Sequence, residues 1–405
     1  MTESRAVTGS RAVTERTQVG IVGGGPAGLL LSHLLALQGI ESVVVELRSR
    51  EHCEARQRAG VIEQGSADLL RTAGLGERMD REALVHGGIY LQFAGERHHV
   101  DFRDLTGGRT VLVYAQTEIV KDLIAARIAA GQRLEFSVTD TAIAGIDGDR
   151  PVMSYTDSAG VRHDVECDVI AGCDGFHGIC RPAVPGLVSV DRVYPYCWLG
   201  ILARVAPSTD ELIYSRNERG FALHSLRSNT VSRLYIQVPP EERIEDWPDE
   251  QIWAELRRRF ALPGWHLADG PVTEKGITEM RSFVSSPMRH GRLFLAGDAA
   301  HIVPATGAKG LNLAVHDVRV LSAGLATWYG GGGSEALDRY SERCLDRVWR
   351  VQEFSSSMSS MLHRLPDDDG GFRRRLQLAQ LRYVTGSEAA ARSLAENYVG
   401  LPHAN

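Results

Sequence analysis

The chain has 405 residues, 43% of them hydrophobic and 24% charged, and its formal net charge is −6. This composition is typical of a soluble globular protein that is long enough for more than one domain. The negative balance excludes any electrostatic reason to expect a nucleic acid or an anionic membrane as partner, and no apolar run has membrane-spanning length.

Six cysteines are scattered along the chain without a Cys-x-x-Cys pair. This spacing suits neither a metal site nor a disulfide framework, and it is typical of a protein from a reducing compartment. The N-terminal residues repeat Ser-Arg-Ala-Val-Thr and lack the apolar core of a secretory signal. We therefore expect a flexible tail over residues 1–16, a cytoplasmic protein and no bound metal.

The first chemical signal is a glycine turn between an apolar stretch and a long apolar run over residues 29–37. Its Gly-x-Gly-x-x-Gly pattern places glycines at 23, 25 and 28, with Ala27 before the last of them. The order strand, turn, helix suits a dinucleotide pyrophosphate, because glycines let the backbone approach the phosphates and the helix start attracts their charge.

A second strand, over residues 42–45, ends in Glu46, eighteen residues after Gly28. An acid at this place accepts hydrogen bonds from the ribose of an adenine dinucleotide. The alternative is a plain βαβ unit in which Glu46 is only a strand-end carboxylate. The two signals together favour the dinucleotide site.

The remaining patterns alternate between helix and strand until residue 193, where turn-separated strands indicate antiparallel hairpins. A strand, Gly-Asp turn and helix then return near residue 291. In chain order we expect helices over 65–73 and 118–129, strands over 88–93 and 167–171, hairpins over 193–238, a helical segment with Trp247 and Trp253, a strand near 293–295, a helix over 311–329, one long helix over 335–362 and a mixed helical tail.

Three separated motifs now stand together: the glycine turn with Glu46, Cys173-Asp174-Gly175, and Gly297-Asp298. Together they resemble the single-component FAD-dependent aromatic hydroxylases. The likeness runs from Thr17 to Pro402 and points to the branch that acts on 4-hydroxybenzoate. It is carried further by residues 56–61, 194–200, 211–214, 219–223, 306–312 and 396–402.

The fold that the resemblance implies is α/β: a Rossmann-like FAD-binding domain, an inserted antiparallel β-sheet substrate domain and C-terminal helices. The FAD-binding domain would be discontinuous, and the C-terminal helices would form a homodimer interface. We assign residues 17–85, 108–186 and 281–334 to the FAD-binding domain, 86–107 and 187–280 to the substrate domain, and 335–405 to the C-terminal region.

The activity that the resemblance implies is hydroxylation of 4-hydroxybenzoate at C3 to protocatechuate, with O₂ and NADH or NADPH as co-substrates. FAD would be bound throughout and would supply a C4a-hydroperoxide as the oxygen donor. Two alternatives stay open. One is the same chemistry on another hydroxybenzoate, and the other is a flavin-binding NADH oxidase that does not hydroxylate.

For the substrate carboxylate, the resemblance implies Arg227 and Ser225, with Tyr235 assisting, whereas Arg233 would lie on the flavin side. Residues two apart on a strand share a face. A three-residue turn over 229–231 would pair Ser225 with Tyr235 and Arg227 with Arg233, and a two-residue turn would put the pairs on opposite faces. A solvated polar sheet face is the alternative reading.

At the phenol end, Tyr214 matches the tyrosine that meets the substrate hydroxyl, Tyr398 the second tyrosine of a proton relay, and His86 the histidine that passes the proton to solvent. A histidine suits that task because its unperturbed pKa is near ~6.5. Taken singly, each tyrosine reads as a core residue with a satisfied hydroxyl and His86 as a loop histidine.

The remaining flavin contacts also follow from the resemblance. Arg58 and Gln116 would lie near the pyrophosphate and ribityl chain, and Asp298 would bind the ribityl side. The backbone of Gly310, Leu311 and Asn312 would face the isoalloxazine ring, where a helix start stabilises negative charge. Lys309 would add a positive charge there, and its alternative is a solvated surface lysine.

One loop departs from the family pattern, because Ala305 stands where a second proline is expected, next to the substrate or flavin. The backbone carbonyl remains, and the stiffness that proline gives is lost. For the nicotinamide, the resemblance implies Arg48, Glu51, His177, Arg181 and Arg281. Arginines at 48 and 50 would attract a 2′-phosphate and the carboxylates of Glu51 and Glu54 would repel it, which favours NADH.

Overall fold

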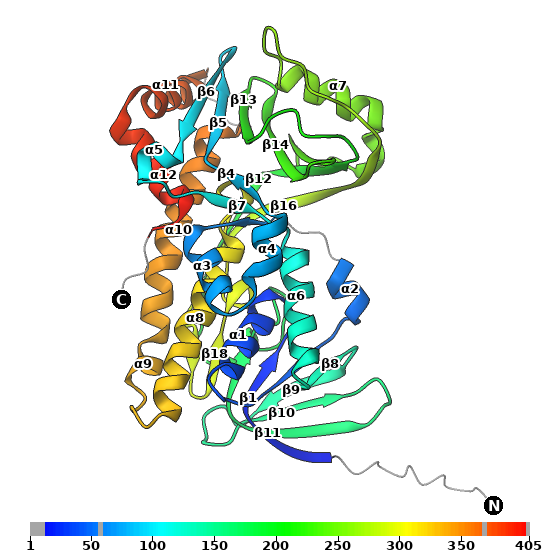
Figure 1. Cartoon of the computed structure of the whole chain (residues 1–405), viewed down its shortest axis with the longest axis vertical. Helices are drawn as coiled ribbons and strands as arrows, with labels where there is room; N and C mark the ends of the chain where they lie inside the picture. The colour runs from blue at the N-terminus through cyan, green and yellow to red at the C-terminus, as the bar shows by residue number, and fades with distance from the viewer. Residues whose placement is uncertain (1–12, 56–59, 367–370, 402–405) are drawn as a thin grey trace, which may run out of the picture.

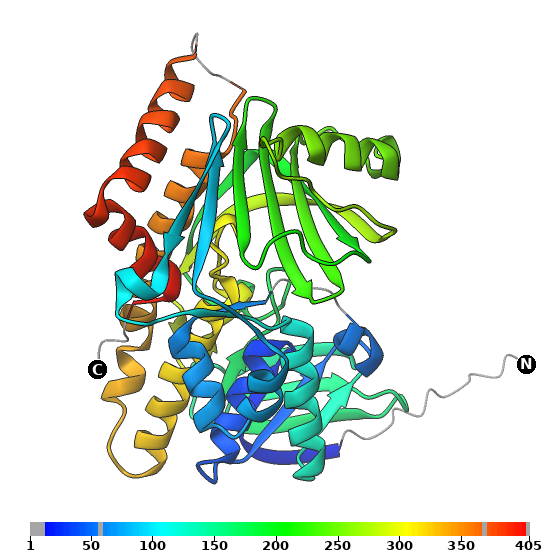
Figure 2. The same ribbon diagram turned by 45° about the horizontal axis from the view of Figure 1, so that its top comes forward.

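The structure is a computed structural model that describes residues 13–55, 60–366 and 371–401. It consists of two halves stacked along the longest axis, each built on an eight-stranded sheet, with the last helices along one side (Figures 1 and 2). Predicted residue Arg58 lies outside the described residues. Among the residues described, no helix combines the length and apolar character needed to cross a membrane.

The lower half in Figure 1 contains the sheet of the glycine turn. Its central strand β1 pairs in parallel with β2 on one side and with β11 on the other. The strand order is β17-β18-β11-β1-β2-β8, and a hairpin of β9 and β10 extends β11. The strands are β1 (Val13–Val22), β2 (Ser42–Glu46), β8 (Leu134–Phe136), β9 (Thr139–Ala144), β10 (Val152–Thr156), β11 (Arg162–Gly172), β17 (Arg289–His290) and β18 (Leu293–Leu295).

The flexible tail expected over 1–16 is wrong for residues 13–16, because β1 begins at Val13, and residues 1–12 lie outside the described residues. Residues 13–16 pair with residues 163–166 of β11 in an unbroken register. Backbone hydrogen bonds to a neighbouring strand therefore order a stretch whose sequence carries little apolar signal.

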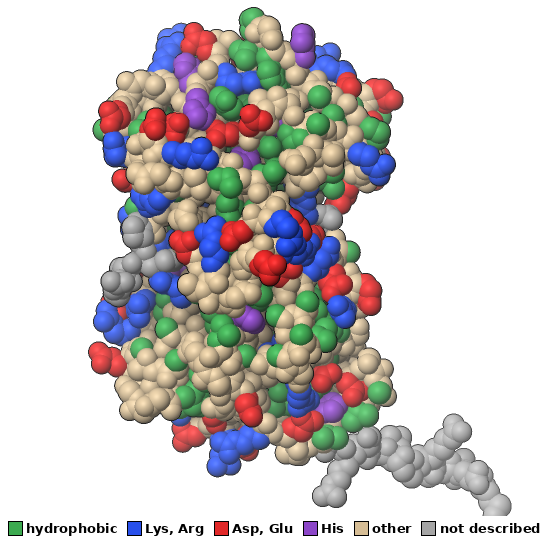
Figure 3. Space-filling model, in the orientation of Figure 1, with side chains coloured by type: hydrophobic (Ala, Val, Ile, Leu, Met, Phe, Trp, Pro, Cys, Tyr) green, Lys and Arg blue, Asp and Glu red, His purple; other side chains and the backbone are tan. Residues whose placement is uncertain are grey.

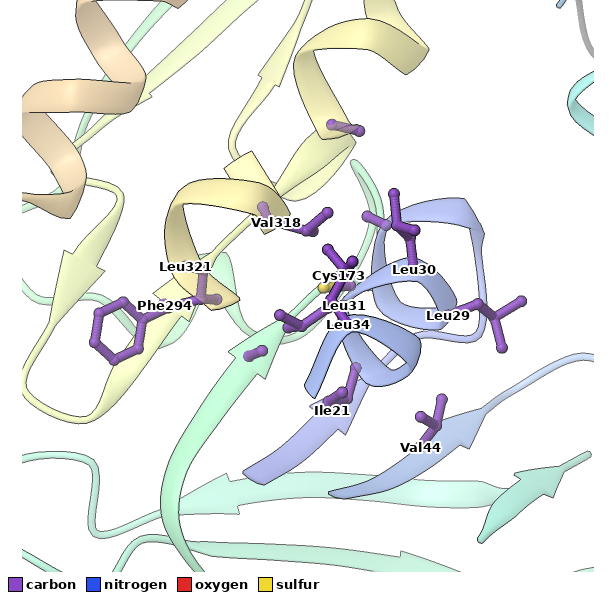
Figure 4. Close-up of a cluster of buried hydrophobic side chains, with 14 of the residues drawn as sticks. Ile21, Leu29, Leu30, Leu31, Leu34, Val44, Cys173, Phe294, Val318 and Leu321 are labelled. Atoms are coloured by element: carbon purple, nitrogen blue, oxygen red, sulfur yellow. The ribbon is translucent and has the colours of Figure 1, made fainter. Parts of the chain in front are cut away.

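Helices cover this sheet and close its core (Figure 4). The run Leu29–Leu34 on α1 (Pro26–Ala36) packs over Ile21 and Val44 of the strands, with Val318 of α8 (Gly310–Tyr329) facing it. Nearly every side chain of α1 is buried, which explains why its sequence is a continuous apolar run rather than an amphipathic one. The other helices of this half are α2 (Arg50–Ala55), α3 (Gln64–Thr72), α4 (Gly76–Glu82) and α6 (Gln116–Ala129).

The upper half is a largely antiparallel sheet in the order β19-β16-β12-β15-β14-β13-β5-β6. The hairpins expected over 193–238 are confirmed, and the pairing of β5 with β13 is parallel. Helix α7 (Asp249–Arg259) covers one face, with Trp247 and Trp253 in the core below it. The strands are β5 (Gly88–Phe93), β6 (Glu96–Asp101), β12 (Val188–Ala203), β13 (Leu212–Asn217), β14 (Gly220–Ser228), β15 (Val231–Val238), β16 (Val272–Ser286) and β19 (His301–Ile302).

Between the halves lie a small sheet and two short turns of helix. The small sheet joins β3 (Val61–Ile62), β7 (Val111–Val113) and β4 (Leu84–His86). The helical pieces are η3 (Gly297–Ala299) and η4 (Ala305–Gly307), and α5 (Phe102–Thr106) follows β6.

The expected single helix over 335–362 is wrong, because the chain turns at Arg339 between α9 (Glu335–Asp338) and α10 (Tyr340–Leu362). Leu337 is buried against Gly324 of α8, and the Tyr340 hydroxyl donates to the Leu295 carbonyl at 2.8 Å. The turn lets both anchors reach their partners. Helix α10 then runs alongside both halves, followed by α11 (Phe372–Gly386) and α12 (Glu388–Val399) (Figure 1).

His363, just after α10, fixes the end of that helix against the upper sheet. Its Nε2 accepts a hydrogen bond from the Trp198 indole at 2.7 Å, and its Nδ1 lies 3.0 Å from the Ser359 carbonyl. These partners suit only the neutral ring, and burial lowers the pKa of His363 to about 3. Protonation would make Nε2 a donor that faces the Trp198 indole N–H, so this hydrogen bond would be lost.

This geometry predicts an acid-sensitive step in stability. At pH values between 6.5 and the pKa of folded His363, this histidine is protonated in the unfolded chain and neutral in the folded chain. The free energy of unfolding therefore decreases as the pH falls. From pH 6.5 to 5 the loss from this residue is about 2 kcal/mol. Urea unfolding of His363→Gln should show a pH dependence weaker by that amount. The exposed control His52→Gln should keep the wild-type slope, and an unchanged slope in His363→Gln would contradict the assignment.

Candidate active site

The glycine turn brings three backbone segments into contact at the carboxyl end of the first sheet. Gly23 has φ +108°, and a Cβ on it would lie 2.3 Å from the Cys173 carbonyl oxygen. A Cβ on Gly28 would lie 2.0 Å from the Gly23 oxygen. These two glycines are therefore required by close packing of the backbone itself.

Gly25 differs from these two, because no atom lies within 4 Å of the position that its Cβ would take. It is the N-cap of α1, no side chain caps that helix, and Pro26 follows at the first turn. The N–H groups in the first turn of a helix have no intrahelical partner, so those at the start of α1 lie at its positive end, beside the open Cβ position of Gly25. This is the arrangement that a pyrophosphate needs.

Glu46 stands beside this turn at the end of β2, as the sequence predicts. One carboxylate oxygen accepts from the Gly24 N–H at 2.7 Å and the other from the Arg48 N–H at 2.8 Å. A carboxylate has about four lone-pair sites, so capacity remains for ribose hydroxyls.

The Gly297-Asp298 turn forms the second edge of this site. The Asp298 side chain is exposed, whereas the turn is held from below by buried Asp317, which accepts from the Gly297 N–H at 2.9 Å and contacts His301 at 2.6 Å. At the start of α8, a Cβ on Gly310 would meet nothing within 4 Å. Two helix starts and an exposed carboxylate therefore border open space, and these residues fit FAD.

Asn312 and Gln116 have different surroundings. Asn312 is buried, and its side chain accepts from the Glu63 N–H and donates to the Val61 carbonyl, so it ties β3 to α8. Its backbone role toward a flavin stays a prediction. Gln116 is the first residue of α6 and is half-buried, and Leu311 is likewise half-buried on α8.

The register of the β14–β15 hairpin differs from both alternatives considered in the sequence. The turn has two residues, since Ser228 pairs with Val231, but a bulge follows and Ser225 pairs with Arg233. The pairs that a three-residue turn would give, Ser225 with Tyr235 and Arg227 with Arg233, are therefore not formed. The bulge at Arg227 restores a common face, because Ser225 opposes Arg233 and Tyr235 lies two residues further along the same strand.

Arg227 and Arg233 lie close together on this face. Burial and the like charge of Arg233 lower the pKa of Arg227. Arg233 stacks over the Tyr235 ring at 5.3 Å, and its Nη1 is buried without a hydrogen-bond partner among the described residues. Two half-buried cations held side by side form a receptor for an anion.

Four rings connect this cationic end to the tyrosine pair, and we call Tyr235, Trp198, Phe221 and Tyr214 the aromatic layer. Neighbouring ring centroids are 4.9, 5.2 and 6.1 Å apart in that order. The layer comes from four adjacent strands of the upper sheet. It places Arg227 and Tyr214 at the two ends of one apolar surface.

Tyr214 and Tyr398 meet at the far end of the aromatic layer. Their hydroxyls are 2.7 Å apart, and both side chains are buried. Burial raises the pKa of both phenols above the ordinary value, so both are neutral at pH 7. The two hydroxyls form a chain along which a proton can move.

His86 does not join this chain in the structure. It is fully buried on β4, and neither ring nitrogen has a hydrogen-bond partner in the described part of the chain. Burial lowers the pKa of His86 to about 4, with Asp210 opposing the shift. The value near ~6.5 is that of an unperturbed histidine and does not apply to buried His86, whose role in the relay stays a prediction.

Lys309 is buried, and the alternative of a solvated surface lysine is wrong. Its Nζ donates to the Glu63 carboxylate and to the Tyr398 carbonyl, both at 2.7 Å. Arg347 of α10 binds the other Glu63 oxygen at 3.1 Å. Burial lowers the pKa of Lys309, and Glu63 counteracts that shift.

Comparison with known proteins agrees with this arrangement. The family described as "FAD binding domain" matches residues 16–355. The chain belongs to this family. It is 48% identical over 96% of its length, and 96% of the relative's, to the p-hydroxybenzoate hydroxylase of Acinetobacter baylyi.

More distant proteins are also similar, either in sequence or in fold. A 3-(3-hydroxy-phenyl)propionate/3-hydroxycinnamic acid hydroxylase of Mycobacterium avium is 25% identical over 82% of this chain and 59% of its own. The crystal structure of p-nitrophenol 4-monooxygenase from Pseudomonas putida DLL-E4 superposes with a TM-score of 0.82 at 20% identity, covering 96% of this chain and all of that one. The expected family and α/β fold class are thus confirmed.

In this FAD-binding protein, the loop with Ala305 is stiffened by α10 rather than by a second proline. The Thr306 hydroxyl lies 2.8 Å from that of Ser359, and a Cβ on Gly307 would lie 2.4 Å from Ser355 Oγ. Ala308 closes the turn in the left-handed region at φ +55°. The Ala305 side chain itself is exposed.

The residues expected to bind the nicotinamide form two groups. Arg181 and Arg281 stack over the Phe176 ring at 4.6 and 4.8 Å, and His177 touches the same ring edge-on at 5.0 Å. Arg48 and Glu51 are exposed at and before α2. Both groups stay predictions as a binding site.

Four residues that hold the site together were not predicted from the sequence: Glu63, Arg347, Asp317 and His301. Each acts through partners more than ten residues away, so no local spacing marks them. The only signal was indirect: His301 lies four residues beyond Gly297, within the second glycine motif.

The two kinds of glycine predict opposite outcomes of substitution. Gly25→Ala should keep the unfolding free energy of the apoprotein within about 0.5 kcal/mol, because its Cβ meets nothing, yet weaken FAD binding at least ~10-fold. Gly28→Ala should cost about 3 kcal/mol or more through the clash with Gly23. Urea unfolding and FAD fluorescence titration measure the two effects. Wild-type FAD affinity in Gly25→Ala would contradict the placement of the phosphates.

Proposed function

We propose that the protein hydroxylates 4-hydroxybenzoate at C3 to give protocatechuate, consuming O₂ and NADH or NADPH with FAD bound. The observation that carries the proposal is the pairing of Arg227 and Tyr214 across the aromatic layer, with Tyr398 at 2.7 Å from Tyr214. The identity to a protein named p-hydroxybenzoate hydroxylase supports it.

The substrate would lie along the aromatic layer with its carboxylate at Arg227. The guanidinium binds a carboxylate through two parallel hydrogen bonds, and Ser225 and Tyr235 share the face from which they can add one each. The anion would also relieve the repulsion between Arg227 and Arg233. Apolar rings around the benzene ring exclude water.

The phenol of the substrate would then meet the Tyr214 hydroxyl. Tyr214 would accept the phenol proton as it donates its own to Tyr398, and Tyr398 would release its proton toward His86, the predicted exit to solvent. The substrate would then be a phenolate, electron-rich ortho to its oxygen. FAD, when bound, would supply the activated oxygen that the ring carbon ortho to the phenolate attacks. Gly23, Gly25, Glu46 and Asp298 would hold FAD, with Lys309 and the α8 start near its ring.

The primary test is NADH and O₂ consumption by the FAD-loaded protein with and without 4-hydroxybenzoate, with product identification. We expect strong stimulation and one protocatechuate per NADH. Stimulation only by a different hydroxybenzoate would favour the same chemistry on that acid. Consumption with peroxide and no hydroxylated product from any of these acids would favour the NADH oxidase.

Arg227→Gln should raise the KM for 4-hydroxybenzoate about 10–100-fold, because a charge-assisted hydrogen bond is lost. The flavin content should not change. The exposed control Arg204→Gln, which removes the same charge from the upper sheet, should keep the wild-type KM. An unaltered KM in Arg227→Gln would remove the carboxylate assignment.

Tyr214→Phe should leave substrate-stimulated NADH oxidation measurable while lowering protocatechuate yield at least ~10-fold, with peroxide released in its place. The physical reason is that the substrate phenol loses its proton acceptor. Product and peroxide are quantified per NADH. A normal yield of protocatechuate would contradict the phenolate step.

We infer a preference for NADH from the exposed Glu51 at the start of α2, whose charge would repel a 2′-phosphate. Glu54 is already paired with Arg50 at 2.7 Å, which leaves Glu51 as the discriminating carboxylate. Glu51→Gln should raise the ratio of kcat/KM for NADPH to that for NADH by a few-fold. The paired control Glu54→Gln should change this ratio less, and no change with Glu51→Gln would remove the reason for the preference.

We also infer a homodimer in the cytoplasm. Large apolar side chains of α10 and α11 are exposed, among them Trp349, Phe372, Leu376 and Tyr383, as expected for a face that a second copy covers. The cysteines at 167, 173, 180, 197 and 344 form no disulfide, which suits a reducing compartment.

A further inference from the structure

A groove of about 690 Å³ lies between α8, α10 and the end of α12, outside the candidate active site. None of the described residues that we expect to hold FAD or the substrate line it. One wall is formed by arginines at 343, 347 and 350 on α10 and by Arg339 at the turn directly before it. These positions recur every three or four residues and therefore share one helix face.

Two arginines that line the groove, Arg343 and Arg350 on α10, have no ion-pair partner within the described ranges 13–55, 60–366 and 371–401. The same holds for Arg319 on α8, which does not line the groove but interacts electrostatically with Arg343 and Arg347. Arg319 is half-buried, and its Nε is enclosed without a hydrogen-bond partner there. The Nε of Arg347 is in the same condition. Buried guanidinium N–H groups of this kind are normally satisfied by a protein or ligand acceptor.

The electrostatic repulsion among these arginines also indicates that a negatively charged acceptor is missing. Burial and the positive charges of Arg347 and Arg343 lower the pKa of Arg319. The acidic neighbours do not balance it: Glu63 is already held by Lys309 and Arg347, Glu342 pairs with Arg339, and Glu335 and Asp346 remain on the wall. Cations gathered against their own repulsion are stabilised when an anion binds among them.

We propose that this groove binds an anion carrying a diphosphate group. From Arg343 to Arg350 the helix rises about 10 Å, so one phosphate reaches only part of the cluster whereas a diphosphate reaches more of it. Planar guanidinium forks suit phosphate oxygens, which accept two parallel hydrogen bonds. The volume of the groove exceeds that of the diphosphate and leaves room for an attached group.

The test is calorimetric titration of the FAD-loaded protein with inorganic pyrophosphate, and separately with ADP, at fixed ionic strength. We expect saturable binding of pyrophosphate to the wild type and at least a tenfold weaker affinity in Arg343→Gln/Arg350→Gln. Both replaced side chains are exposed, so the variant should fold. Tighter binding of ADP would identify a nucleotide as the ligand, and equal or weaker binding would identify the phosphates alone.

The matched control is Arg204→Gln/Arg382→Gln, which removes two exposed charges elsewhere and should bind pyrophosphate like the wild type. Absence of saturable binding, or equal affinity in the groove variant, would overturn the proposal. Loss of the binding on adding NADH would also overturn it, because the anion would then occupy the nicotinamide site. The proposal would likewise be overturned if the groove variant dissociated from a dimer into monomers but bound pyrophosphate with wild-type affinity.

Discussion

The buried carboxylate of Glu63 joins three parts of the chain that are far apart in sequence. It forms ion pairs with Lys309 at the start of α8 and with Arg347 on α10. The backbone N–H of Glu63 also donates a hydrogen bond to the Asn312 side chain. Gly400 approaches so closely that a Cβ there would lie 2.2 Å from the carboxylate. Because Lys309 also binds the Tyr398 carbonyl, the position of the last tyrosine depends on this ion pair. Removing one partner of such a buried pair costs about 3–5 kcal/mol.

The upper sheet contributes the other half of the site through an irregularity. A bulge at Arg227 offsets the two-residue turn of the hairpin, so that Ser225, Arg233 and Tyr235 share a face. Without the extra residue the side chains of one strand would point away from those of the other. The aromatic layer then sets the separation between the cationic end and the tyrosine pair.

Local signals explain which parts of the fold could be predicted. The glycine turn, Glu46 and the buried runs of α1 and β2 are fixed by neighbours in sequence, and they lie where expected. The hairpin register, the break at Arg339 and the burial of His86 and Lys309 depend on contacts across the molecule. Rules based on residue spacing do not predict contacts between segments so far apart in the sequence. Tyr214 and Tyr398 were paired only through resemblance, since 184 residues separate them.

The face of the molecule shown in Figure 3 mixes acidic and basic side chains.

The pairing of β18 with β11 has a consequence for synthesis of the chain. The sheet that begins at Val13 is completed on that edge by residues 289–295, which form β17 and β18, and the turn bearing Asp298 follows directly. Such distant pairings make folding slow, because the intervening chain must be ordered before the contact forms. A ribosome-bound chain that ends before this strand lacks one rim of the flavin cradle. We therefore expect the flavin to bind only after this strand and turn have been translated.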